Sequence, residues 1–285
     1  MTEIYDDRPC ELGEGPLWHP GRGQLFWFDI LGRKLLSRTA AGPLSWSFGE
    51  CVSAAGWIDR DRLLVASETA LSVFDLTRGT SDRVVPLVAD RPDLRSNDGR
   101  ADPWGGFWIG TMGKRAEPGQ GSVWRLYRGE MRRLFAPLTI PNAISFTPDA
   151  LFAHFADSAT GVVWRVGLDE AGWPAGDPVR FIDLAGQPGV PDGAVCDTQG
   201  NLWLAEWGAA RVACYGPDGR FRRAVAIPGL HASCPAFGGP ALDRLHVTSA
   251  RENLPPEVIA AEPRNGCTFV ADAGATGLAE PGVAL

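Results

Sequence analysis

The segment that decides the fold runs from Arg95 to Met112 and reads RSNDGRADPWGGFWIGTM. It opens with the polar triplet Asn97-Asp-Gly99, turns through residues 102–106 and ends in the apolar run Phe107-Trp-Ile109. Two short runs separated by a turn rich in Gly and Pro are typical of paired antiparallel strands. The segment therefore predicts a β-hairpin whose entrance carries amide and carboxylate side chains.

The same pattern returns along the chain, for example at residues 141–149 (PNAISFTPD) and 191–205 (PDGAVCDTQGNLWLA). Its starting points are separated by roughly 40 to 50 residues, the period expected of four-stranded propeller blades. They fall at Glu14, Ala54, Asp98, Asn142, Asp192 and Cys234. We therefore predict an all-β fold, a six-bladed β-propeller with four-stranded antiparallel blades, occupying residues 1–285 as a single domain.

Composition and charge narrow the class of partner. With 35 Gly, 23 Pro and 45% hydrophobic residues among 285, the chain is rich in turns and can still bury a core. Its net charge of −7, without a run of like charges, argues against nucleic-acid and acidic-membrane surfaces and favours a small-molecule partner. The N-terminus lacks a signal peptide pattern and the six cysteines are scattered, so we expect a cytoplasmic monomer with reduced thiols.

The propeller predicts where the polar entrances meet. The innermost strand of each blade lines the central channel, so residues at its start converge from distant parts of the sequence. Carboxylates and amides gathered in a narrow channel repel one another or lose hydration unless something compensates them, and a bound cation is the simplest compensation. The residues predicted to meet there are Glu14, Asn97, Asp98, Asn142 and Asp192.

An ordered set of motifs carries a family resemblance. It includes GEGPLW at 13–18, NDGR at 97–100 with GTM at 110–112, FADS at 155–158, NLW at 201–203 and PAFGG at 235–239. The set is collinear from about residue 10 to about 255 and resembles the regucalcin and gluconolactonase family of six-bladed propellers. The resemblance implies hydrolysis of sugar lactones to aldonic acids.

The resemblance also implies residue roles. It places the ligands of one divalent cation on Glu14, Asn142 and Asp192, and substrate contacts on Arg95, Asn97 and Asp98. An all-oxygen set suits Ca²⁺, Mg²⁺ or Mn²⁺, although Zn²⁺ and Fe²⁺ stay open. The cation would polarise the lactone carbonyl while Asp192 orients or activates the attacking water.

The chain departs from the family pattern at two informative places. Ala143 stands where the family usually has Gly after the ligand Asn, and Lys114-Arg115 follow Thr-Met where animal regucalcins carry acidic residues. Sugar recognition on that loop should therefore differ. We expect the tryptophans, with Glu206-Trp207, to belong to the blade core and the four histidines to have structural or surface roles.

Each site residue has a simpler interpretation when taken alone. Gly-Glu-Gly-Pro around Glu14, Asn97-Asp-Gly99 and Asp192-Gly193 are each common in ordinary turns, and only their shared position in the repeat favours binding. Two other functions stay open: hydrolysis of another ester or an organophosphate, and a metal-binding propeller without catalysis. Neither a serine-hydrolase elbow nor a phosphate-binding loop is present.

Overall fold

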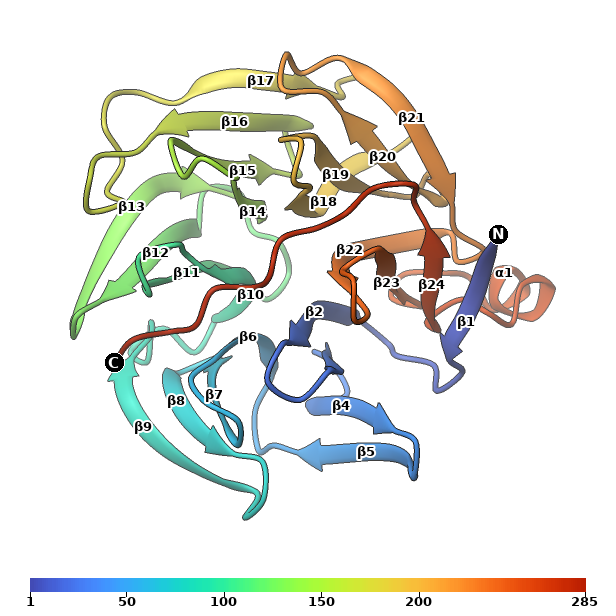
Figure 1. The fold of residues 1–285 in the computed structure, drawn as a ribbon, viewed down its shortest axis with the longest axis horizontal. Helices are drawn as coiled ribbons and strands as arrows, with labels where there is room; N and C mark the ends of the chain where they lie inside the picture. Colours follow the sequence, from blue (N-terminus) through green and yellow to red (C-terminus); the bar gives the residue numbers. More distant parts are fainter.

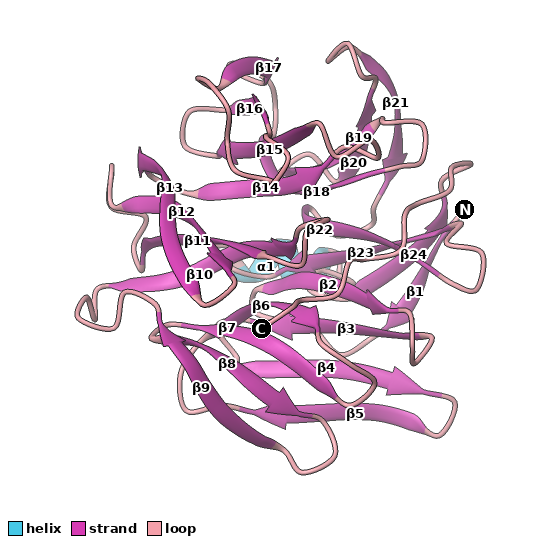
Figure 2. Cartoon of the chain, turned by 60° about the vertical axis from the view of Figure 1, so that its left-hand side comes forward, coloured by secondary structure: helices cyan, strands magenta, loops and turns pink.

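The computed structural model describes all 285 residues and consists of six four-stranded antiparallel sheets arranged in a ring (Figure 1). This arrangement confirms the predicted six-bladed propeller. Five of the six blades begin along the chain with their innermost strand and end with their outermost one, and Figure 2 shows outer strands such as β5, β9 and β13 at the rim of the molecule.

The first blade contains β2 (Gly13–His19), β3 (Gln24–Asp29), β4 (Lys34–Thr39) and β5 (Gly42–Ser47). The second contains β6 (Val52–Trp57), β7 (Arg62–Ser67), β8 (Ala70–Asp75) and β9 (Thr80–Pro86). The third contains β10 (Leu94–Ala101), β11 (Phe107–Gly113), β12 (Gly121–Tyr127) and β13 (Glu130–Leu138). The fourth contains β14 (Pro141–Phe146), β15 (Phe152–Asp157), β16 (Val162–Gly167) and β17 (Val179–Asp183). The fifth contains β18 (Val190–Cys196), β19 (Leu202–Trp207), β20 (Arg211–Tyr215) and β21 (Phe221–Ala226).

The sixth blade closes the ring by joining the two ends of the chain, a point that the sequence left open. Strands β22 (His231–Gly238), β23 (Arg244–Ala250) and β24 (Thr268–Asp272) are completed by the N-terminal strand β1 (Thr2–Asp6). In the β1–β24 pair, Thr2 lies opposite Ala271 and Ile4 opposite Phe269. The single α-helix, α1 (Pro256–Ala261), precedes β24, and no helix is long and apolar enough to span a membrane.

The core lies between neighbouring blades because the inner strands carry small and apolar residues on both faces. Every residue of β14 is buried, whereas nearly all residues of the outer strand β9 are exposed. Trp27, Trp108 and Trp203 are fully buried, as expected for blade-core residues. All six cysteines are buried free thiols.

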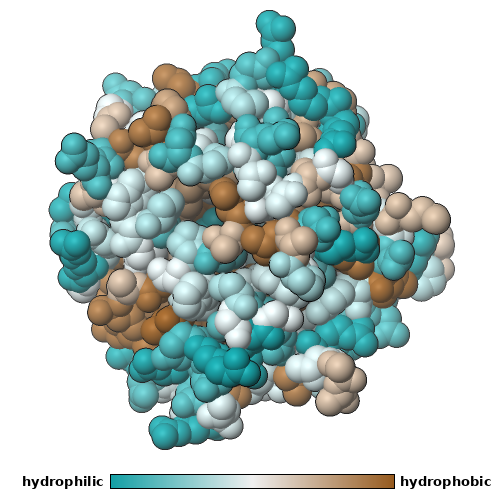
Figure 3. Space-filling view, in the orientation of Figure 1, coloured by the Kyte–Doolittle hydropathy of each residue, from teal (hydrophilic) through white to brown (hydrophobic).

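The last segment of the chain, residues 276–285, crosses one face of the ring, where the red ribbon runs over the middle of the propeller in Figure 1. Main-chain hydrogen bonds hold it at Trp57, whose carbonyl accepts from the Val283 amide, and at Gly105, whose carbonyl accepts from the Ala284 amide. We call this segment the C-terminal strap. Figure 3 shows the strap face, where side chains of mixed hydropathy cover the middle of the ring. The inner strands therefore open toward ligands on the opposite face.

Candidate functional site

A β-bulge places the first polar side chain of each inner strand. In the pairing of every innermost strand with its neighbour, the register shifts at the entrance: just after Glu14 and Asn142 on β2 and β14, and across Asp192 on β18, between Pro191 and Ala194. A bulge bends the strand and re-aims a side chain. In this propeller the bulge interrupts the alternation of side chains between the two faces of the inner strand. Because the sequence pattern repeats, each blade has one such position.

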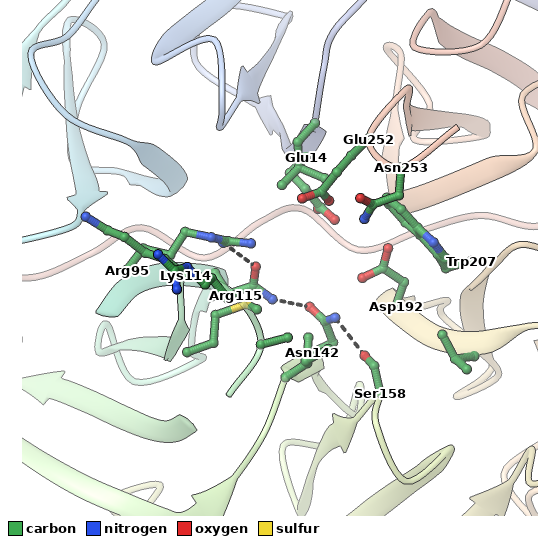
Figure 4. A pocket seen from close by; sticks show the side chains of 16 residues that line it. Glu14, Arg95, Lys114, Arg115, Asn142, Ser158, Asp192, Trp207, Glu252 and Asn253 are labelled. Carbon is green, nitrogen blue, oxygen red and sulfur yellow. Dashed lines mark hydrogen bonds between the residues drawn. The ribbon is translucent and has the colours of Figure 1, made fainter. Parts of the chain in front are cut away.

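The entrances meet in a cavity of about 370 Å³ on the face opposite the strap, within the range of about 300–1,000 Å³ usual for small-molecule sites. Five of the six predicted site residues line it together: Glu14, Arg95, Asn97, Asn142 and Asp192. Figure 4 shows Glu14, Asn142 and Asp192 directed toward the same central space from three different blades.

A chain of hydrogen bonds fixes the amides of this cavity. The Arg95 guanidinium donates to Asn97 Oδ1 at 2.7 Å, and Asn97 Nδ2 donates to Asn142 Oδ1 at 2.8 Å. Asn142 Nδ2 then donates to Ser158 Oγ at 2.9 Å, and Ser158 donates to the Pro191 carbonyl at 2.6 Å. Each amide is thereby oriented by a partner on a neighbouring strand, and the Asn142 oxygen keeps a free lone pair.

The two carboxylates lack such partners. Glu14 accepts one hydrogen bond, from the Gly15 amide at 3.1 Å, and Asp192 accepts none; neither forms an ion pair although both are at least nine-tenths buried. Burial and, after it, the charge of Asp98 raise the pKa of Glu14 to about 8. Burial followed by the charge of Glu14 holds the pKa of Asp192 well above its usual range. Two uncompensated buried carboxylates repel each other, and either protonation or a bound cation would relieve that repulsion.

Asp98 occupies a different position from the one that the sequence predicted. It does not line the cavity, and its Oδ2 accepts a hydrogen bond from the Ile144 amide of the next blade at 2.8 Å. Burial raises its pKa to about 6, while the nearby Arg100 charge opposes that rise. Asn97 and Asp98 lie inside the register shift of β10, between Ser96 and Gly99, and their side chains have different partners on β14: the Asn142 amide for Asn97 and the Ile144 main chain for Asp98. The carboxylate of Asp98 joins two blades and adds negative charge behind Glu14.

Several cavity residues were missed or misjudged from the sequence. Trp207, expected in the blade core, lines the cavity with its ring stacked on His231 at 4.1 Å between centroids. Its neighbour Glu206 is buried and accepts hydrogen bonds from Arg211 and Tyr215. None of the four histidines lines the cavity. The other additions that carry polar groups are Ser158, Glu252 and Asn253, while Lys114 and Arg115, in the loop where sugar recognition was expected to differ, also line the cavity.

The position of Glu252 could not be found from the repeat, because it follows β23 in the irregular segment before α1. Its half-buried carboxylate approaches the cavity from the last blade, and burial raises its pKa. Ser158 belongs to the FADS motif noted in the sequence. Its position beside Asn142 follows from the antiparallel pairing of the start of β14 with the end of β15.

The donor set fits a divalent cation. Glu14, Asp192 and the Asn142 amide offer oxygen atoms only, the choice of hard cations such as Ca²⁺ and Mg²⁺. No group of three or more His, Cys, Asp or Glu side chains gathers in a metal-binding arrangement anywhere in the structure, so a site here depends on the amide as well as the two carboxylates. The unpartnered Asp192 carboxylate is the observation that favours this fit.

Comparison with known proteins places the chain in a family. The sequence profile described as SMP-30/Gluconolactonase/LRE-like region matches residues 12–251. An L-arabinolactonase of Azospirillum brasilense is 37% identical over 98% of this chain and 94% of its own length. A 6-deoxy-6-sulfogluconolactonase of Pseudomonas putida is 31% identical over 96% of this chain and 95% of its own length.

Among solved structures, that of a calcium-binding protein, regucalcin, from Agrobacterium tumefaciens superimposes with a TM-score of 0.98 at 39% identity. The match covers 100% of this chain and 98% of that protein. The matched profile spans all but the first 11 residues and the strand and strap that follow residue 251. The chain therefore belongs to the SMP-30/gluconolactonase/LRE-like family of β-propellers.

Proposed function

We propose that this protein hydrolyses a sugar lactone to the corresponding aldonic acid with the help of a divalent cation held by Glu14, Asn142 and Asp192. Lactone hydrolysis is supported by the relatives named as lactonases, which match nearly the whole chain. The metal dependence is supported by one observation above all: two buried carboxylates share a cavity and neither has an ion-pair partner.

When bound, the cation would supply a Lewis acid that polarises the lactone carbonyl. The chain's own residues then have three tasks. Asp192 accepts a hydrogen bond from the attacking water and orients it, and Asn97 and Arg95 bind the sugar hydroxyls and hold the ring. Water adds to the carbonyl carbon and the ring ester bond breaks. The ring oxygen leaves as a hydroxyl, and the product is a carboxylate with release of a proton.

The identity of the cation and of the sugar goes beyond the comparisons. The regucalcin from Agrobacterium is described as calcium-binding, and an oxygen-only donor set is compatible with Ca²⁺, Mg²⁺ or Mn²⁺ and permissive toward Zn²⁺ and Fe²⁺. The relatives act, by name, on arabinolactone and on sulfogluconolactone, so both a neutral and a charged lactone are precedents.

The test is hydrolysis of gluconolactone, xylonolactone, arabinolactone and galactonolactone, followed by acid release at constant pH. The protein is stripped with a chelator and reloaded separately with Ca²⁺, Mg²⁺, Mn²⁺, Zn²⁺ or Fe²⁺, and spontaneous opening is subtracted with a control lacking protein. We expect turnover that disappears on stripping and returns with at least one cation. Equal turnover in stripped and reloaded protein would contradict the metal dependence.

A panel of aryl esters and phosphotriesters run in the same way decides between the two alternatives. Turnover there without turnover of any lactone would favour a different hydrolase. Saturable cation binding without any turnover would favour a binding module.

A further inference from the structure

The charges that line the cavity are divided between its two sides. In Figure 4, Glu14, Glu252 and Asp192 lie toward the side of the first and last blades, whereas Arg95, Lys114 and Arg115 lie together on the other side. All three cations come from the third blade: Arg95 from β10, and Lys114-Arg115 from the turn that follows β11. The cavity therefore has an acidic half and a basic half.

The turn that carries two of these cations is fixed by its main chain. The Lys114 amide donates to the Asp93 carbonyl at 2.9 Å, and the Arg115 amide donates to Glu117 Oε2 at 3.1 Å. Gly113 permits this approach, because a Cβ there would lie 2.1 Å from Glu117 Oε2. Lys114 Nζ donates to Glu68 Oε2 at 2.7 Å, but the Arg115 guanidinium forms no ion pair and no side-chain hydrogen bond.

Arg95 contributes a third, buried cation to the basic half of the cavity. Its side chain is about nine-tenths buried, forms no ion pair and uses one guanidinium nitrogen for both of its hydrogen bonds, to Ser96 O and Asn97 Oδ1. Its other guanidinium nitrogens have no protein acceptor, and the residue lines the cavity. A buried cationic donor group without an acceptor is a site for an oxygen ligand.

Charge balance indicates which ligand this half attracts. The three carboxylates of the lining lie on its acidic half and Glu68 compensates Lys114 alone, so the Arg95 and Arg115 guanidinium groups leave an excess of positive charge on the basic half. The rest of the protein is acidic, with a net charge of −7, so this excess is local. A neutral sugar would leave it uncompensated at the Arg115 end, whereas an anionic group there would compensate it.

We propose that Arg115, with Lys114 beside it and Arg95 behind it, forms a subsite for an anionic substituent on the lactone, remote from its carbonyl. The chemistry is that of a carboxylate, sulfonate or phosphate, each of which accepts paired hydrogen bonds from a guanidinium. The proposal deepens the proposed function and rests on it. It makes Arg115 the residue that selects among lactones.

The experiment compares D-glucono-1,4-lactone with D-glucaro-1,4-lactone, which differ only by a hydroxymethyl or a carboxylate at the end remote from the carbonyl, together with the galactose-derived pair. We expect Arg115→Gln to raise KM for the carboxylated lactones about five- to tenfold and KM for the neutral ones less than about twofold, with kcat nearly unchanged. Rising salt should raise KM for the carboxylated lactones in the wild type and much less in the variant. Equal KM changes for both lactones of a pair would overturn the proposal.

Two further variants sharpen the result. Glu68→Gln removes the carboxylate that binds Lys114, so KM for the carboxylated lactones should fall, opposite in sign to Arg115→Gln. Arg133→Gln is the matched control, because Arg133 is an exposed arginine without an ion pair on β13 of the same blade, away from the cavity. It should change neither KM. A Glu68→Gln variant with raised KM for the carboxylated lactones alone would contradict the proposal.

A binding measurement separates this proposal from the proposed function. Calorimetric titration of chelator-stripped protein with glucarate and with gluconate needs neither turnover nor the cation. We expect glucarate to bind more tightly than gluconate and to lose that advantage in Arg115→Gln. If neutral lactones are hydrolysed but glucarate has no advantage, only the subsite is wrong. If glucarate keeps its advantage and no lactone is hydrolysed, the lactonase proposal fails and the subsite stands. The 6-phosphate and 6-sulfonate of gluconolactone, used as further substrates, then show which anion fits best.

Discussion

The two ends of the central channel are built from the same inner strands but differ in whether their buried charges have ion-pair partners. At the cavity end, Glu14 and Asp192 face each other without an ion pair. At the strap end, Arg100 forms an ion pair with Glu280 of the strap and also donates to the Ile144 and Ala194 carbonyls at 3.1 and 3.0 Å. All four side chains are at least nine-tenths buried. One end compensates its charge within the chain, and the other leaves charge for a ligand to compensate.

As a result, a single inner strand carries side chains for a ligand at one end and side chains that stabilise the fold at the other. On β10, Arg95 and Asn97 line the cavity while Arg100 serves the strap end a few residues later. A buried ion pair whose partners are fully hydrogen-bonded resists disruption, whereas unpaired buried carboxylates destabilise the protein that holds them. The channel therefore predicts opposite effects on folding when a carboxylate is neutralised at either end.

The largest effect is expected at the cavity end. Asp192→Asn keeps the shape of the side chain but removes the charge that would hold the cation and orient the water. We expect kcat/KM for the preferred lactone to fall by about 10³-fold or more. In stripped protein near pH 8 the same change should raise the free energy of unfolding, because it removes a repulsion between buried charges.

Activity assays and urea denaturation of the same preparation provide the measurement. Asn253→Ala, at an exposed residue on the cavity rim, is the control for general disturbance of the site. An Asp192→Asn variant that is both active and less stable would overturn the contrast between the two ends.

At the strap end, Glu280→Gln should destabilise the fold. The substitution leaves the Arg100 guanidinium buried without its carboxylate, and breaking such a pair costs about 3–5 kcal/mol. The measurement is the free energy of unfolding in denaturant. Glu262→Gln is the matched control, since it breaks the exposed Glu262–Arg264 pair and should cost less than about 1 kcal/mol. Equal effects of the two substitutions would show that the strap pair is no more important than a surface pair.

The pH dependence of stability should also distinguish stripped from metal-loaded protein. The folded-state pKa of Glu14 is about 8, above its unfolded value of 4.5, so the folded protein binds more protons between these values. Stability of the stripped protein should therefore fall as pH rises from about 4.5 to 8, by on the order of 3 kcal/mol. A bound divalent cation stabilises the ionised form and should abolish most of this fall.

Urea denaturation at pH 5, 6.5 and 8, with and without the cation, measures this dependence. Glu14→Gln should flatten the profile of the stripped protein. A stripped protein that is as stable at pH 8 as at pH 5 would mean that the two carboxylates are compensated by a group within the chain.

The sequence predicted the architecture because the propeller is a repeat, and each repeat carries its own turn signals. The entrance positions of all six inner strands, from Glu14 to Cys234, were located by period alone and lie on β2, β6, β10, β14, β18 and β22. The ring closure by β1 was left open because pairing of Thr2 with Ala271 joins residues at opposite ends of the chain. Nothing local in either strand specifies that partner.

The cavity was predicted less completely because its residues come from outside the repeat as well as from it. Asn97 and Asn142 could be placed from their strand position, and Arg95 from the family resemblance. Glu252 lies in an irregular segment, and Asn97 and Asp98 both lie inside the bulge of β10, where strand alternation does not predict which side chain lines the cavity. The strap pair of Arg100 and Glu280 spans 180 residues, so sequence reasoning had no signal for it.

The smallest effect tests the bulges that aim the cavity side chains. Gly15 and Ala143 follow the proposed ligands Glu14 and Asn142 and share a left-handed conformation, with φ of 53° and 56°. Ala143→Gly would relieve about 1–2 kcal/mol of backbone strain. It would lose a buried methyl worth about 0.8 kcal/mol and add about 0.5–1 kcal/mol of unfolded-chain entropy. We therefore expect the unfolding free energy to change by less than about 1 kcal/mol, with activity retained.

The converse change, Gly15→Ala, should be severe, because a Cβ there would lie 2.3 Å from the Ser53 carbonyl oxygen and would push the first blade away from the second. Denaturation midpoints of the two variants measure the contrast. If both substitutions are neutral, the bulge geometry does not constrain the positions of Glu14 and Asn142. If Ala143→Gly destabilises strongly, the methyl of Ala143 contributes more packing at the entrance of the fourth blade than the strain of its backbone costs.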